Sequence, residues 1–92
     1  MILSFKHKGL ELFFKTGKKS GINAQHSKKL QLILGALQAA TAPKDMNLSG
    51  LFLHSLSGRR AEIWSVRVNG NWRITYRFRG ENVEIVNYED YH

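Results

Sequence analysis

Hydrophobic residues in the N-terminal half of the chain recur three and four positions apart, which is the period of an α-helix. Two such stripes are present: Leu10, Phe13 and Phe14, and then Leu30, Ile33, Leu34 and Leu37. Gly17 is the predicted end of the first helix, and Asn23 can cap the second. Pro43 ends the helical region, because proline lacks an N–H group and clashes with the preceding turn. The pattern therefore predicts two helices, preceded by a short strand over residues 2–5.

The C-terminal half alternates between apolar and polar residues, which is the period of a β-strand. Apolar side chains occupy Trp64, Val66 and Val68, and then Trp72, Ile74, Tyr76 and Phe78. The three residues 69–71, Asn-Gly-Asn, separate the two strands and indicate a hairpin. A three-residue loop with Gly70 or Asn71 left-handed pairs Val66 with Ile74 and Val68 with Trp72, and it keeps one face apolar.

This register places Arg67 opposite Arg73 on the other face of the hairpin. Two like charges in that position are unfavourable unless they extend into water or bind an anion. A following two-residue turn at Gly80 pairs Phe78 with Val83 and Arg77 with Glu84. If the last strand stays regular, Asp90 and His92 point to the same face as the two arginines.

We therefore expect residues 1–92 to form a single α+β domain, with two N-terminal helices packed on a small, mainly antiparallel sheet. Cysteine is absent, which excludes disulfides, thiolate zinc sites and a cysteine nucleophile. No apolar run approaches the roughly 20 residues that cross a membrane, and no signal peptide is evident, so we expect a cytoplasmic protein. Nothing in the sequence indicates a cofactor or a metal site.

The chain carries a net charge of +7 and has a pI near 10.1, which favours an anionic partner such as nucleic acid. All lysines lie between Lys6 and Lys44, and all arginines lie between Arg59 and Arg79. Candidate RNA contacts are Arg67 and five lysines: Lys15, Lys18, Lys19, Lys28 and Lys29. For each lysine, a solvated helix face is a comparably good explanation.

Two segments combine groups that can carry chemistry. The chain ends in Tyr-Glu-Asp-Tyr-His over residues 88–92, and His54 lies in an apolar stretch before a turn. Histidine titrates near neutral pH without assistance, which suits it to proton transfer. The alternatives are a frayed polar terminus for the first segment and a structural histidine for the second.

Several segments together resemble one known family, the HigB toxins of the RelE-type toxin–antitoxin superfamily. The resemblance covers essentially the full length. It rests on Ser-Phe-Lys-His-Lys-Gly at 4–9, Leu-His-x-Leu-x-Gly at 53–58, Trp-Ser at 64–65, Asn-Trp-Arg-Ile-Thr at 71–75 and Asn-Tyr-Glu-Asp-Tyr-His at 87–92.

The resemblance implies the RelE-like microbial RNase fold and a ribosome-dependent endoribonuclease that cuts mRNA in the decoding site. It also implies inhibition by a HigA-like helix-turn-helix antitoxin, with operator DNA bound only through that antitoxin. The catalytic group that it carries over is His54, Asp90, Tyr91 and His92, with Arg73 as a phosphate contact. Relatives often have proline and lysine where this chain has Ser55 and Ser57, and Arg59 or Arg60 is a candidate to replace the missing charge.

RNA cleavage without a metal requires a base for the 2′-OH, a cation for the phosphate and an acid for the leaving 5′-oxygen. Arg73 suits the phosphate, with Arg67 assisting, since a guanidinium stays charged and binds two oxygens. His54 and His92 are the acid–base candidates in either order. Asp90 orients a histidine or acts as the base itself, and Tyr91 stacks on a base or bonds the sugar. The rival hypotheses are a non-catalytic basic nucleic-acid-binding module and a ParE-type gyrase-inhibiting toxin.

Overall fold

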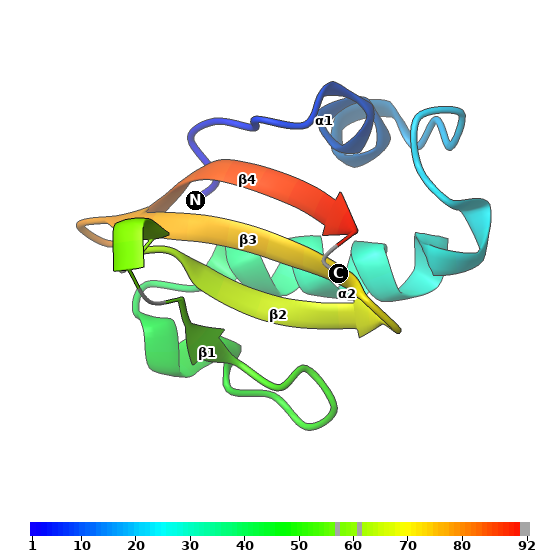
Figure 1. Cartoon of the computed structure of the whole chain (residues 1–92). Coiled ribbons are helices and arrows are strands. Elements are labelled where there is room, and N and C mark those ends of the chain that lie inside the picture. The colour runs from blue at the N-terminus through cyan, green and yellow to red at the C-terminus, as the bar shows by residue number, and fades with distance from the viewer. Residues whose placement is uncertain (57, 61, 91–92) are drawn as a thin grey trace.

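The structure is a computed structural model that describes residues 1–56, 58–60 and 62–90. Four strands form one antiparallel sheet in the order β1-β2-β3-β4: β1 (His54–Ser55), β2 (Trp64–Asn69), β3 (Trp72–Arg79) and β4 (Asn82–Asp90). Helix α2 (Ser27–Ala39) crosses one face of this sheet, and helix α1 (Lys8–Thr16) lies beside β4 (Figure 1). The predicted α+β class, with two N-terminal helices on a mainly antiparallel sheet, is confirmed.

Both ends of α1 are fixed by local hydrogen bonds. The His7 imidazole precedes the helix, and its Nδ1 accepts a hydrogen bond from the Leu10 N–H at 3.0 Å. Gly17 ends the helix as predicted: it adopts a left-handed φ of 81°, and its N–H donates to the Phe13 carbonyl at 2.8 Å.

The second helix differs from the prediction at both ends. The Asn23 side chain caps a 3₁₀ turn, η1 (Ala24–His26), through a 3.0 Å bond from the Gln25 N–H, and α2 begins only after that turn. Helix α2 ends at Ala39, before Pro43, which instead opens another 3₁₀ turn, η2 (Pro43–Met46). Proline is favourable at the first position of such a turn, since its missing N–H is not needed there.

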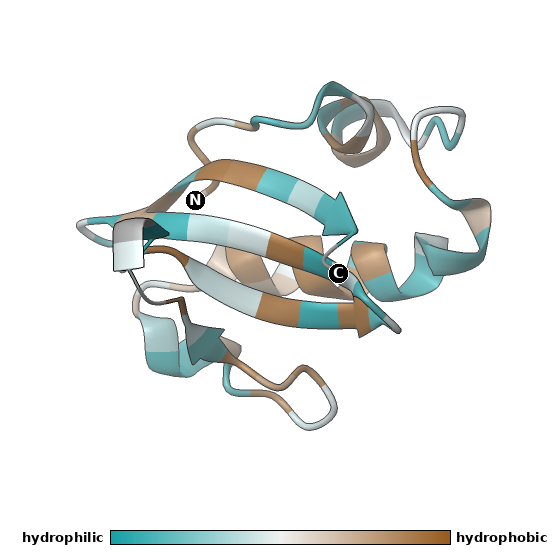
Figure 2. Cartoon of the chain, in the orientation of Figure 1, coloured by the Kyte–Doolittle hydropathy of each residue, from teal (hydrophilic) through white to brown (hydrophobic). Residues whose placement is uncertain are grey.

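The core lies between α2 and the sheet. The predicted stripe of Leu30, Ile33, Leu34 and Leu37 is buried against Val66, Ile74, Tyr76 and Val86. Figure 2 shows the strands alternating between hydrophobic and hydrophilic residues, as a sheet with one buried face requires. The helices and the sheet thus form two layers, and the opposite face of the sheet is left for polar residues.

The first hairpin has the predicted register over most of its length. Val66 pairs with Ile74 and Arg67 pairs with Arg73, which confirms the like-charged pair. The expected pair of Val68 with Trp72 is wrong, because a bulge between Arg67 and Asn69 brings Asn69 opposite Trp72. This bulge shortens the loop to two residues while Val68 stays buried, and Gly70 has the expected positive φ of 56°.

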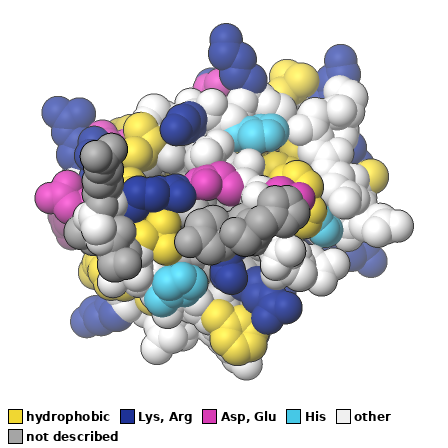
Figure 3. All heavy atoms as spheres, in the orientation of Figure 1, with side chains coloured by type: hydrophobic (Ala, Val, Ile, Leu, Met, Phe, Trp, Pro, Cys, Tyr) yellow, Lys and Arg dark blue, Asp and Glu magenta, His cyan; other side chains and the backbone are white. Residues whose placement is uncertain are grey.

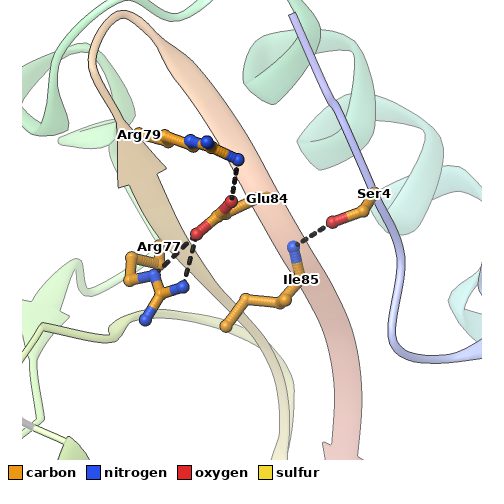
Figure 4. A network of polar contacts seen from close by, with 5 residues as sticks. All are labelled: Ser4, Arg77, Arg79, Glu84 and Ile85. Atoms are coloured by element: carbon orange, nitrogen blue, oxygen red, sulfur yellow. Dashed lines mark hydrogen bonds and ion pairs between the residues drawn. The ribbon is translucent and has the colours of Figure 1, made fainter.

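The second hairpin follows the prediction only as far as residue 84. Phe78 pairs with Val83, and Arg77 pairs with Glu84, where the guanidinium Nη2 lies 2.5 Å from the carboxylate Oε2. A bulge then inserts Ile85, which has a left-handed φ of 50°. The Ile85 N–H, which a regular ladder would pair, donates instead to the Ser4 hydroxyl at 2.8 Å (Figure 4).

Residues 1–6 run parallel to β4, which brings Ser4 next to Ile85. Isolated bridges join Ile2 to Val83 and Phe5 to Val86, so the segment predicted as a short strand pairs with β4 without forming a full strand. Backbone hydrogen bonds run in both directions between this segment and β4. The Leu3 N–H donates to the Val83 carbonyl at 2.6 Å, and the Val86 N–H donates to the Ser4 carbonyl at 3.1 Å.

The bulge at Ile85 changes which face each later residue of β4 occupies. Arg73 now pairs with Glu89, and Trp72 pairs with Asp90. The prediction that Asp90 shares a face with Arg67 and Arg73 by alternation is therefore wrong, and the same prediction for His92 lies outside the described residues. The physical reason is burial: without the bulge, Asn87 and Glu89 would face the core in place of Val86 and Tyr88.

Candidate active site on the outer face of the sheet

The face of the sheet opposite α2, called the outer face below, carries two adjacent rows of polar residues. In one row, His54 pairs with Ser65, Ser65 with Thr75, and Thr75 with Asn87. In the next row, Arg67 pairs with Arg73, and Arg73 with Glu89. Figure 3 shows basic, acidic and histidine side chains together on this face. Residues that are far apart in the sequence are thus brought together by strand register.

His54 lies in the edge strand β1 with its imidazole exposed. Its Nδ1 is 3.1 Å from the Phe52 carbonyl oxygen, and because a carbonyl can only accept, Nδ1 donates. This bond fixes the ring and leaves Nε2 directed to other partners. Neutral His54 therefore offers a proton acceptor at Nε2, and protonated His54 offers a donor at the same atom.

Arg73 lies two strands away from His54 and one row along the sheet. Strand spacing and residue rise put their Cα atoms about 12 Å apart. An arginine and a histidine that extend toward each other can span that distance with a phosphate group between them. Arg67 lies directly opposite Arg73, so both side chains leave the same face of the sheet from neighbouring strands. Like charges this close are favourable when an anion binds between them.

Glu89 lies opposite Arg73 on the outer face, the face that was predicted for Asp90. Its carboxylate accepts hydrogen bonds from Arg60 Nη2 at 2.6 Å and Thr75 Oγ1 at 2.5 Å. Burial alone would raise the pKa of Glu89, but the bonds from Arg60 and Thr75 outweigh it and hold the pKa below its usual value. Glu89 is therefore an ionised structural carboxylate and a weak base.

The ion pair with Glu89 also bears on Arg60 as a replacement for the lysine that relatives often have at position 57. Arg60 was a candidate to supply positive charge in place of a lysine at position 57, yet its guanidinium is ion-paired with Glu89. The pair borders a cavity of about 190 Å³, which Lys6, Ile63 and Asn87 also line. Ser57 lies outside the described residues, and the side chain of Arg59 is not described.

His7 and His26 have structural environments. His7 caps α1, and His26 is buried with its Nδ1 2.5 Å from the Tyr88 hydroxyl. The Tyr88 ring stacks on Trp72 with 4.5 Å between centroids. Burial raises the pKa of the Tyr88 phenol, and the nearby charge of Asp90 adds to this effect. In the part of the chain that the structure describes, no three His, Asp or Glu side chains gather closely enough to hold a metal ion.

The structure brings together some of the predicted residues and separates others. His54, Arg67 and Arg73 share the outer face, and exposed Asp90 ends β4 beside them, facing the Trp72 side. The five candidate lysines lie on α1, in the loop after it and at the start of α2, away from the outer face (Figure 1). Lys15 is ion-paired with Glu11 at 2.8 Å. Tyr91 and His92 lie outside the described residues.

Sequence reasoning did not single out Phe52 as a functional residue. Its carbonyl orients His54, and its ring lies beneath the Arg67 guanidinium, 5.6 Å from the carbon to the ring centroid. The available signal was an apolar run, Leu51 to Leu53, directly before the histidine. Apolar residues are usually buried, yet the middle residue of this run, Phe52, is exposed.

A helix layer on one side and a basic, histidine-bearing sheet face on the other define a small α+β protein suited to binding an anionic polymer. Comparison with known proteins identifies the family to which this chain belongs. The chain belongs to the HigB-like toxin family, RelE-like toxins of type II toxin–antitoxin systems, whose family model matches residues 3–92. It is 46% identical over 92 residues to the Endoribonuclease HigB of Proteus vulgaris, covering 100% of both chains.

Membership in this family implies an antitoxin partner. None of the helices in the described part of the chain has the length and apolar character needed to cross a membrane.

Proposed function

We propose that this chain cleaves mRNA in the decoding site of the ribosome and thereby inhibits translation. That it is a toxin with endoribonuclease activity follows from the family match and from the full-length relative. The proposal adds the ribosome as the place of action and acid–base chemistry without a metal. The observation that carries it is an exposed, oriented imidazole at His54 on the same sheet face as Arg67 and Arg73.

The reaction requires two proton transfers around one phosphate. A base takes the proton of the 2′-OH, the 2′-oxygen attacks phosphorus, and the bond to the 5′-oxygen breaks as an acid protonates that oxygen. Arg73 binds the phosphate oxygens and stabilises the charge that grows on them, and Arg67 assists from the opposite strand. The products are a 2′,3′-cyclic phosphate and a 5′-OH.

His54 is one of the two proton carriers in this proposal. With Nδ1 bonded to the Phe52 carbonyl, its Nε2 takes or gives the proton. His92 is the second carrier, and Asp90 and Tyr91 complete the group, as the family resemblance implies. The position of Asp90 supports its inclusion: it is exposed at the end of β4, one residue after Glu89, the partner of Arg73.

The partners follow from the same family. A HigA-like helix-turn-helix antitoxin holds the toxin inactive, and operator DNA is bound only through that antitoxin. Lys15, Lys18, Lys19, Lys28 and Lys29 contact ribosomal RNA from the helix side of the molecule, while the outer face holds the mRNA. The site of action is the cytoplasm, where ribosomes are.

The test is cleavage of mRNA with and without ribosomes by the wild type and by His54→Ala. The matched control is Ser55→Ala, which changes the other residue of β1. We expect wild type to cut only ribosome-bound mRNA, His54→Ala to be slower by about 10²–10⁴-fold, and Ser55→Ala to stay within about twofold of wild type. Full-rate cleavage by a folded His54→Ala protein contradicts the role of His54, and cleavage of free mRNA contradicts ribosome dependence.

A further inference from the structure

Phe52 is the most exposed aromatic residue among those described, with 64% of its surface open to solvent. Its neighbour Leu51 is fully buried, so the chain turns a large apolar side chain outward directly beside the core. The backbone at Phe52 has a φ of 51°, a left-handed conformation that is unfavourable for any residue with a side chain. Such strain persists where the surrounding structure holds it, and it concentrates at functional sites.

The segment around Phe52 is held firmly in this conformation. The Arg67 N–H donates to the Leu51 carbonyl at 2.7 Å, and the Leu51 N–H donates to the Leu48 carbonyl at 3.1 Å. Buried Leu51 anchors the segment from below. The ring of Phe52 is therefore displayed from a fixed backbone and not from a long loose loop.

The Arg67 guanidinium lies over the Phe52 ring, 5.6 Å from its centroid. Hydrophobic and basic atoms adjoin at the edge of the outer face in Figure 3. An aromatic ring and a guanidinium are the two groups on which single-stranded bases stack, because both present flat π-faces. Arg67 also stands opposite Arg73, which places this aromatic–cation pair next to the proposed phosphate position.

Phe52 is also tied directly to His54, because its carbonyl accepts the hydrogen bond from the imidazole Nδ1. The exposed Phe52 ring and the oriented His54 imidazole are therefore only two positions apart in the chain. A base that stacks on Phe52 therefore lies at a fixed place relative to the proton carrier.

We propose that Phe52, together with Arg67, is a stacking site for one unpaired nucleobase of the RNA next to the linkage that is cut. This inference deepens the proposed function and rests on it. The ligand class is single-stranded RNA, and discrimination between bases is weak because every base has a π-face. Phe52 positions the substrate and takes no part in proton transfer.

The test places 2-aminopurine, a base whose fluorescence falls on stacking, at each codon position of an mRNA bound to ribosomes. A 2′-deoxy sugar at the cut linkage prevents cleavage without any change to the protein. We expect wild type and Phe52→Tyr to quench the signal at one position, and Phe52→Ala to leave it unquenched. The control is Leu32→Ala, which removes another exposed apolar side chain, 57% exposed on α2, and we expect it to behave as wild type.

Cleavage of the 2′-OH substrate is the second readout. We expect Phe52→Ala to cut about tenfold to a hundredfold more slowly than wild type, and to match wild type when the stacked position is abasic. Quenching by Phe52→Ala equal to wild type, or equal cleavage of the intact substrate, overturns the stacking site while leaving the proposed function standing. Quenching that depends on Phe52 without any cleavage by wild type supports the stacking site and overturns the proposed function.

One further outcome concerns a different partner. If Phe52→Ala loses binding to the antitoxin while its quenching and cleavage equal those of wild type, the exposed ring is a protein contact and the RNA proposal is wrong. Circular dichroism of each variant verifies folding, and Phe52→Tyr provides a conservative replacement that keeps the ring.

Discussion

The two faces of the sheet are built from alternate residues of the same strands, yet they hold together in different ways. The face toward α2 is filled by side chains such as Val66, Ile74 and Val86, which are fully buried. The outer face carries His54, Arg67, Arg73 and Glu89, which meet through strand register, and one part of it is held by the Arg60–Glu89 ion pair. Burial of apolar area stabilises far more than partly exposed ion pairs do. The inner face therefore contributes most of the stability, and the outer face carries the proposed site.

Two neighbouring residues of β3, Ile74 and Arg73, point to opposite faces, so substitutions there test the two faces separately. Ile74→Ala removes fully buried atoms, and we expect it to lower the free energy of unfolding by about 2–5 kcal/mol. Arg73→Ala should cost about 1 kcal/mol or less, yet slow mRNA cleavage by about 10²–10³-fold. Chemical denaturation and ribosome-bound cleavage measure the two effects.

Arg79→Ala is the matched control for Arg73→Ala, since Arg79 lies on the same strand and face but is highly exposed near the turn. Its cleavage rate should stay close to that of wild type. If Arg73→Ala and Arg79→Ala slow cleavage equally, the effect comes from overall charge and not from a phosphate contact.

Glu89 gives a pH-dependent test of the outer face, because its pKa is lowered in the folded protein by Arg60 and Thr75 against the effect of burial. A carboxylate whose pKa is lower in the folded than in the unfolded state stabilises the folded protein at pH values above its unfolded-state pKa. That contribution is lost as the pH falls through its folded-state pKa. Glu89→Gln should therefore cost about 1–2 kcal/mol near pH 7, and the difference from wild type should shrink as the pH falls through the lowered pKa of Glu89.

Unfolding by urea over a series of pH values checks this prediction. Glu81→Gln, in the exposed turn before β4, is the control for removing a negative charge alone. A difference between wild type and Glu89→Gln that stays constant down to low pH would show that the ionised carboxylate is not the stabilising form.

Two tyrosines on the inner face give the smallest effects. The buried Tyr88 hydroxyl bonds to His26, so Tyr88→Phe should lower the free energy of unfolding by about 1 kcal/mol. The Tyr76 hydroxyl is also buried but has no hydrogen-bond partner among the described residues, and burial raises its pKa. Tyr76→Phe should therefore be neutral or stabilising by up to about 1 kcal/mol, as thermal denaturation can measure. A loss in Tyr76→Phe equal to that in Tyr88→Phe would contradict the difference in hydrogen bonding.

The sequence predicted the elements whose residues act locally or by simple alternation. The helix stripes, the stop at Gly17 and the pairing of Arg67 with Arg73 all follow from spacing and turn chemistry. It failed at Ile85, because a bulge depends on partners outside the strand, here the hydroxyl of Ser4. The adjacent apolar pair Ile85 and Val86 was the visible warning, since strict alternation buries only one of the two.

The same limit applies to the candidate site. His54 and Arg73 were selected from their chemistry and from the family resemblance, and strand register places both on the outer face. Glu89 was not selected, because its place on that face depends on the bulge at Ile85. Phe52 was missed because its exposure follows from a left-handed backbone conformation, which a phenylalanine in the sequence does not predict.

The bond from the Ile85 N–H to the Ser4 hydroxyl joins positions that are 81 residues apart. Contacts of such long range form late in folding, since a large loop must close before they contribute. The bulge at Ile85, which this bond stabilises, determines which face of the sheet each later residue of β4 occupies. A toxin built this way gains its final geometry only after nearly the whole polypeptide is available.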